Sequence, residues 1–175
     1  MTKRLLIASL ALAAVAACTT VPTKDIKVTT DADPTVSFAG FKTYGLLGET
    51  DLINDAEGRW TGAPFDVSQR IQYLIDQQLG ERGITKNTAN ADLLLVYGIG
   101  IDMDNIDLEI DEKTDYLTAT NVPAGSLLIV LADSRTGVPV WVASASADIQ
   151  EGADEETMQK RLDYAVKKMF EELPD

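Results

Sequence analysis

Apolar positions repeat at helical spacing in two segments of the chain, and each segment is predicted to form a helix. A helical stripe begins after Asp66, which is placed to cap the helix with Gln69 in the capping-box position, and it ends at Gly83. A second helix is predicted over residues 154–173, where an acidic start precedes one apolar stripe. Each stripe predicts a helix that packs one face against a core.

Alternating or continuous apolar runs predict strands over residues 26–30, 42–47, 92–104, 125–133 and 138–149. Residues 134–137 form a hairpin connection with Gly137 where a positive φ is needed, and Trp141 is predicted to pack in the core of this hairpin. Residues 48–64 and 112–124 are predicted to be irregular. This order of elements predicts an α+β fold, a mostly antiparallel sheet with two helices packed on one face.

Carboxylates alternate with apolar residues from the end of the predicted central strand onward. They are Asp102, Asp104, Asp107, Glu109 and Asp111, with a turn or bulge near residues 104–105. One interpretation is a surface that binds a cation or a basic partner. The other is the solvated face of a sheet, and it is favoured because the outward positions of a half-buried strand are usually polar.

The glycine-rich stretch of residues 48–64 contains a lone aromatic side chain, Trp60. Long loops in compact domains are often functional, so Trp60 is a candidate anchor for a ligand or a partner. The commoner outcome for such a residue is an aromatic ring that folds back onto the core.

The first 18 residues have the organisation of a secretory signal. Lys3 and Arg4 precede an apolar run over residues 5–14, and residues 15–18 end on Cys18, the single cysteine of the chain. The pattern resembles the lipobox of bacterial lipoproteins, which implies that Cys18 becomes the acylated first residue of the mature chain. The alternatives are an ordinary signal peptide that leaves a free thiol, or a spanning anchor, for which about 20 apolar residues are needed.

The signal divides the chain into three parts. Residues 1–17 are the signal peptide, residues 18–24 the lipidated N-terminus and tether, and residues 25–175 one domain. About 150 residues suffice for a single core. Thr19 follows the cysteine, and resemblance to lipoproteins that lack Asp at this position implies the outer membrane, with the domain in the periplasm.

The net charge of the chain excludes some classes of binding partner. The formal charge is −13, and loss of Lys3 and Arg4 with the signal makes it −15. Nucleic acid requires a basic footprint, and anionic headgroups attract Lys and Arg clusters. We therefore expect no nucleic-acid partner, and contact with the membrane only through the N-terminal lipid.

The amino-acid composition of the chain lacks most of the residue types that catalytic sites use. The chain has no histidine, and acylation would consume its one cysteine, so the usual transition-metal ligands and triad bases are missing. No phosphate-binding or nucleophile-elbow motif is present. We expect no metal, no cofactor and no enzymatic activity. A carboxylate-only hydrolase is the remaining enzymatic alternative, and it would require a paired geometry.

Three sequence segments together resemble a family of bacterial lipoproteins defined only by a domain of unknown function. They are F-x-x-F-K-T-Y at residues 38–44, A-D-L-L-L-V-Y at residues 91–97, and G-x-L-x-I followed by D-x-x-T-G and V-W over residues 125–143. The resemblance implies an envelope location and an α+β fold. It carries no activity and no catalytic residues.

These observations predict a non-enzymatic, outer-membrane-anchored lipoprotein that acts by binding, either as an accessory to a protein complex of the cell envelope or in maintaining the envelope. The alternative is a periplasmic binder of small ligands or cations. That alternative would use Trp60 in its loop and the carboxylates of residues 102–111.

Overall fold

The computed structural model describes residues 21–104, 106–110, 117–121, 123–150 and 152–174. The predicted Cys18 and Asp111 sites lie outside these residues. The elements in chain order are β1 Lys27–Ala32, β2 Thr43–Asn54, α1 Val67–Glu81, β3 Thr85–Lys86, β4 Leu93–Asp102, β5 Ile106–Ile110, β6 Leu117–Asn121, β7 Ala124–Asp133, β8 Pro139–Asp148 and α2 Glu155–Glu171. Short 3₁₀ turns occupy Phe38–Gly40 and Thr88–Asn90.

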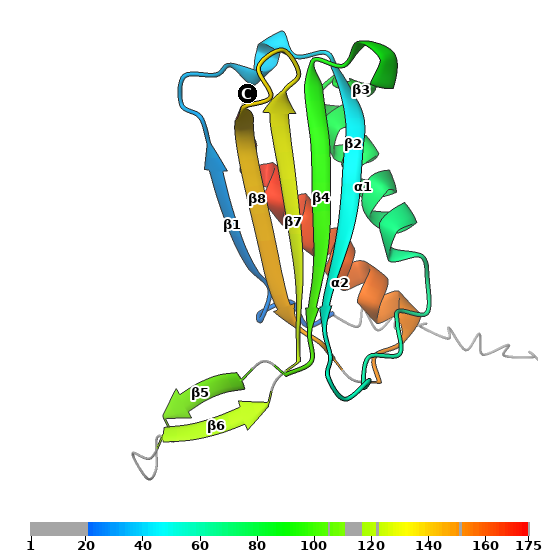
Figure 1. Ribbon diagram of the computed structural model, residues 1–175, viewed down its shortest axis with the longest axis vertical. Helices are drawn as coiled ribbons and strands as arrows, with labels where there is room; N and C mark the ends of the chain where they lie inside the picture. The colour runs from blue at the N-terminus through cyan, green and yellow to red at the C-terminus, as the bar shows by residue number, and fades with distance from the viewer. Residues whose placement is uncertain (1–20, 105, 111–116, 122, 151, 175) are drawn as a thin grey trace, which may run out of the picture.

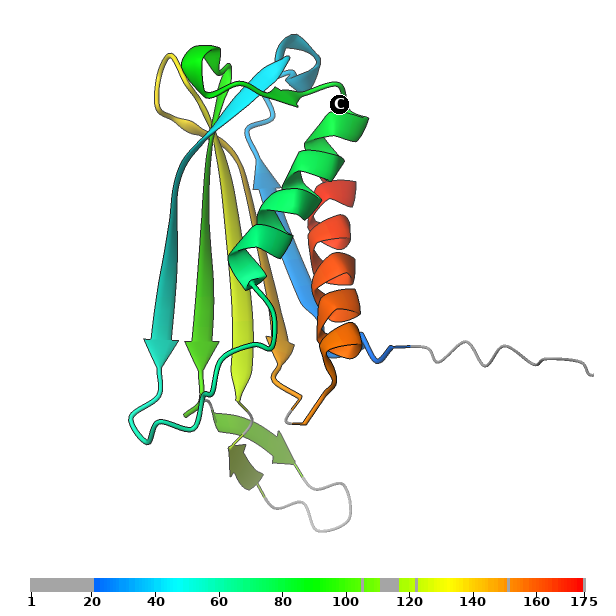
Figure 2. The same cartoon turned by 90° about the vertical axis from the view of Figure 1, so that its right-hand side faces the viewer.

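The main sheet has six strands in the order β1-β8-β7-β4-β2-β3. Neighbours are antiparallel except that β2 runs parallel to both β4 and β3. Helix α1 connects the parallel strands β2 and β4, and α1 and α2 cover the same face of the sheet (Figure 2). The predicted α+β fold, mostly antiparallel with two helices on one face, is confirmed.

Alternate side chains of the strands face the helices and form the core with them. Leu93, Leu95 and Tyr97 of β4 point to the helical face and are buried, and Ile129 of β7 lies at the same level. Trp141 of β8 is 1% exposed and its ring lies 5.0 Å from that of Phe170 of α2. The core position predicted for Trp141 is therefore confirmed.

Both predicted helix starts are confirmed. The Asp66 carboxylate accepts a hydrogen bond from the Gln69 backbone N–H at 2.8 Å, and Asp154 caps α2 in the same way. Gly83 has a φ of 75°, a conformation that glycine adopts at low cost and that ends α1.

Two segments predicted to be irregular contain strands. β2 continues from Gly48 to Asn54 beside β4, with a bulge at Leu47 that restores the alternation of its side chains. Because β3 pairs only with the first residues of β2, the rest of β2 is a sheet edge, where exposed polar residues are tolerated. The polarity of residues 48–54 therefore reflects an edge rather than a loop.

The second error concerns residues 112–124. Residues 117–121 form β6, which pairs with β5 in a separate two-stranded ribbon (Figure 1). The ribbon extends from the end of the main sheet at which β4 finishes and β7 begins. No helix in the described residues is long and apolar enough to cross a bilayer.

Candidate functional site

A cavity of about 400 Å³ lies between the sheet and the first turns of both helices. It is formed by the last residues of β2, β4 and β8, the start of β7, and the loop of residues 55–66. Its walls are mainly aliphatic and aromatic: Ile53, Trp60, Phe65, Ile101, Met158 and Leu162. We refer to it as the tether-end cavity, because the N-terminal segment joins the domain beside it.

Element lengths explain why a cavity forms here. The ten residues of β4 span about 33 Å, whereas the 15 residues of α1 span about 22 Å and the 17 of α2 about 25 Å. The helices therefore cannot cover the whole helical face of the sheet. Ile99 and Ile101 continue the inward row of Tyr97 toward the end that the helices leave open.

The loop that carries Trp60 is held by Asp55. The Asp55 carboxylate accepts hydrogen bonds from the backbone N–H groups of Trp60 at 2.6 Å and Arg59 at 2.9 Å. The Trp60 N–H is the largest cause that holds the pKa of Asp55 below its usual value. Arg59 in turn pairs with Asp104 at 2.6 Å. These contacts fix the loop against the end of β4 and place Trp60 in the cavity wall, partly buried and outside the main core.

Arg161 of α2 connects the cavity to the N-terminal segment. It is buried, and its guanidinium donates to the Asp25 carboxylate, to the Pro22 carbonyl and, at 3.2 Å, to the Asp148 carbonyl. The hydrogen bond from Arg161 is the main cause that lowers the pKa of Asp25. Arg161 also lines the cavity, so one side chain holds both the tether and the cavity wall.

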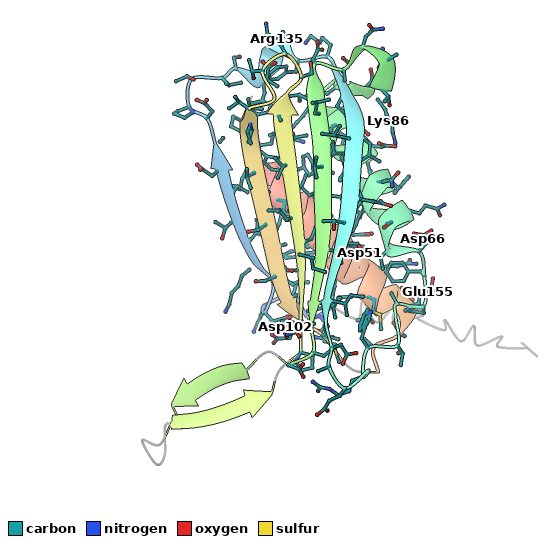
Figure 3. The ribbon with its side chains drawn as sticks, in the orientation of Figure 1. Asp51, Asp66, Lys86, Asp102, Arg135 and Glu155 are labelled. Atoms are coloured by element: carbon teal, nitrogen blue, oxygen red, sulfur yellow. The ribbon has the colours of Figure 1, made fainter. Side chains whose placement is uncertain are left out.

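Charge at the cavity is predominantly negative. Asp51, Asp66 and Asp148 line it, and Arg161, the one cation among the described residues of its lining, is already paired with Asp25. Figure 3 labels Asp51 and Asp66, which come from β2 and from the start of α1. The cavity lining therefore combines apolar side chains with three acidic residues.

Of the carboxylates predicted from the sequence as a binding surface, the structure describes the side chains of Asp102 and Asp104. Asp102 accepts hydrogen bonds from Asn54 at 2.9 Å and from the Asp104 N–H at 3.0 Å, and Asp104 pairs with Arg59. Asp107 and Glu109 belong to β5 in the separate ribbon, and their side chains are outside the described part. Among the described residues, no three His, Cys, Asp or Glu side chains are grouped to hold a metal.

Sequence reasoning missed Arg161 and the cavity around it. A signal was present, because Arg161 lies between Met158 and Leu162 in the apolar stripe of the second helix. A charge within such a stripe indicates a buried ion pair. Its partner Asp25 lies 136 residues away, and no local pattern connects the two.

Parts of the three segments that resemble the lipoprotein family meet at the opposite end of the sheet: the start of β2, the start of β4, and the turn between β7 and β8. The Asp92 carboxylate accepts hydrogen bonds from the backbone N–H groups of Lys42 at 2.8 Å and Thr43 at 3.0 Å, and joins β4 to the start of β2. Asp133 pairs with Arg135 at 2.7 Å in the turn between β7 and β8. Arg135 and Asp102 mark the two ends in Figure 3. These motif residues have structural roles, away from the cavity.

Stability is expected to fall in acid. The Lys42 N–H lowers the pKa of Asp92, Arg135 lowers that of Asp133, and Arg161 lowers that of Asp25. A carboxylate with a lowered folded pKa contributes stability above its unfolded pKa, which is lost as the pH falls through the folded value. Melting temperatures should therefore be level from about pH 7 to pH 5 and decrease below about pH 4.

Thermal melts of the wild type and an Asp92→Asn variant test this dependence. The variant should melt lower at pH 7, and its melting temperature should decrease less on acidification. A wild-type melting temperature that stays unchanged down to pH 2 would contradict the assignment of these carboxylates.

Comparison with known proteins gives one family and a shared fold. A family model described as "Domain of unknown function (DUF4136)" matches residues 28–175. No curated protein matches the chain in sequence.

Three solved structures resemble the chain with a TM-score of 0.50 each. A DUF4136 family protein from Bacteroides thetaiotaomicron is 14% identical, over 84% of this chain and 95% of that one. PelC from Paraburkholderia phytofirmans, solved as a dodecamer, is 13% identical, over 85% and 99%. A PDZ domain protein from Parabacteroides distasonis is 15% identical over 86% of this chain, which spans only 36% of that protein. At such identities the likeness is one of fold alone.

Proposed function

The chain belongs to the family defined by the domain of unknown function DUF4136, and from this premise we propose that it is a lipid-tethered, non-enzymatic binding protein of the bacterial cell envelope. Its anchor is the acylated Cys18 in the outer membrane, and its domain lies in the periplasm. The observation that carries the proposal is an apolar cavity beside the tether. The partners are the membrane, through the lipid, and a protein of the envelope.

Support for the anchor comes from the N-terminal sequence. A basic pair, a short apolar run and a small-residue site lead to Cys18, and the described domain begins only a few residues later. Several acyl chains on one cysteine would hold the protein at the membrane almost permanently, since each buried methylene contributes about 0.8 kcal/mol. Arg161 then fixes the domain to the tether at Pro22 and Asp25.

Support for binding rather than catalysis comes from the side chains at the cavity. Two of its charged groups already have structural roles: Asp66 caps α1, and Arg161 pairs with Asp25. The interior offers aliphatic and aromatic surface, which suits a hydrophobic ligand. The cation-binding alternative is not favoured, because Asp102 and Asp104 are engaged with Asn54 and Arg59.

Membrane fractionation tests the anchor. We expect wild-type protein in the outer membrane and a Cys18→Ser variant released from it, because the thiol is the only attachment point of the lipid. Thr19→Asp is the matched variant for sorting and should move the protein to the inner membrane. Wild type and Cys18→Ser that fractionate identically would contradict the tether, and crosslinking in intact envelopes would then be done on a free domain.

A further inference from the structure

The tether-end cavity is elongated. A second cavity of about 170 Å³ continues it, and the two share Val67, Ile99 and Leu162 in their walls. The second cavity reaches Ile71 of α1 and Ala165 of α2. From Met158 to Ala165 the helix rises about 10 Å, so the apolar cleft runs lengthwise between the sheet and the two helices.

The shape and lining of this cleft point to one ligand class. A cleft that extends along two helices, with an apolar lining over its length, accommodates a linear apolar chain. Its walls are mostly aliphatic, with few groups that could orient a polar ligand by hydrogen bonds. We propose that the cleft binds a single fatty acyl chain whose headgroup is uncharged or cationic. This inference rests on the proposed function and names its ligand.

The charged residues that line the cleft determine which lipid headgroups it can accept. Asp51, Asp66 and Asp148 are among the residues that line the cavity, and Asp25 neutralises Arg161. An anionic headgroup would meet carboxylates, and the described residues that line the cleft include no free cation, so its binding is opposed by Coulomb repulsion. A glyceryl ester or an ammonium headgroup meets no such penalty.

The position of the cleft indicates where the bound acyl chain could come from. Arg161, which lines it, also holds Pro22, and Cys18 lies four residues before Pro22. Four residues span at most about 14 Å, so the cleft is held close to the lipid anchor and the bilayer. The acyl chain can therefore belong to the lipid on Cys18 or to a separate membrane lipid, and both sources share the same chemistry.

Binding of octanoyl-, decanoyl- and dodecanoylglycerol to purified Cys18→Ser protein tests the proposal, by calorimetry and by fluorescence of Trp60. Each buried methylene should raise the affinity about fourfold, and each step of two carbons about fifteenfold, until the cleft is filled. Dodecanoate should bind at least about tenfold more weakly than dodecanoylglycerol, and dodecyltrimethylammonium at least as tightly.

Two substitutions locate the site. Ala153 lies in a loop that lines the cavity, and Ala153→Phe should reduce dodecanoylglycerol affinity at least tenfold by filling it. Ala39→Phe is the matched control, since Ala39 is exposed in the turn Phe38–Gly40 near the opposite end of the sheet. The affinity of this variant for dodecanoylglycerol should equal that of the unsubstituted protein. If Ala153→Phe fails to fold, Ala63→Phe replaces it, because Ala63 lines the same cavity from the other loop.

Each outcome of these binding experiments either overturns or supports the proposal. No binding, affinity independent of chain length, or equal affinity of wild-type and filled cavities overturns the proposal. Weaker dodecanoylglycerol binding by lipidated wild type than by Cys18→Ser supports it and identifies the Cys18 lipid as the occupant, and equal binding supports it with a separate lipid. Because the assay uses Cys18→Ser protein, it can fail or succeed whether or not Cys18 is acylated in the cell.

Discussion

Replacement of Trp141 by alanine should lower the free energy of unfolding by about 3–5 kcal/mol, the range for deleting a buried aromatic side chain. The indole is 1% exposed and lies 5.0 Å from the Phe170 ring, at the junction of the sheet and α2. The surrounding strand and helix can collapse only partly into the space left behind, so a cavity remains. Urea denaturation followed by circular dichroism measures the loss.

Trp141→Phe is the matched variant for this position. Within the described residues the indole Nε1 has no hydrogen-bond partner, and a buried unpaired donor carries a desolvation penalty. Phenylalanine removes that donor and retains most of the apolar contact, so the loss should be about 1 kcal/mol. Equal losses for Trp141→Ala and Trp141→Phe would show that the ring does not fill the core as described.

The second large effect is expected at Arg161. Arg161→Met keeps much of the packing of the side-chain stem and removes the guanidinium, which leaves the Asp25 carboxylate and the Pro22 and Asp148 carbonyls without their donor. We expect a loss of about 3 kcal/mol, at the low end for breaking a buried pair, because Asp25 retains some exposure and a hydrogen bond from the Asp148 N–H.

Two further variants separate the ion pair from general damage to α2. Asp25→Asn in the Arg161→Met chain should recover part of the loss, since the unpaired carboxylate is then removed. Lys167→Met on the exposed face of α2 should change stability by less than about 0.5 kcal/mol. Trypsin should also cleave after Lys24 faster in Arg161→Met, because the tether is no longer held. Equal stabilities of Arg161→Met and Lys167→Met would contradict the role given to Arg161.

Local patterns in the sequence were sufficient for much of the fold. The cap at Asp66 and the turn glycines Gly83 and Gly137 depend on interactions a few residues apart, and the structure has them as predicted. Trp141 was predicted in the core because its strand was apolar on both sides of the residue. Each of these features is decided within one element or one turn.

Features decided by distant residues could not be predicted in this way. Residues 48–54 were mistaken for a loop because their polarity belongs to a sheet edge, and the edge exists only because β3 is short. The cavity depends on the difference in length between strands and helices. The Asp25–Arg161 pair joins the two ends of the domain sequence. Trp60 was a predicted candidate, but its place in the cavity wall depends on Asp55 and on the end of β4.

Every proposed role of this protein depends on its attachment to the membrane, which can be measured as the intact mass of the chain purified from membranes. We expect a mature chain of residues 18–175 that carries covalently bound acyl chains on Cys18. A chain that begins at Cys18 without acyl mass, or that retains residues 1–17, would contradict it.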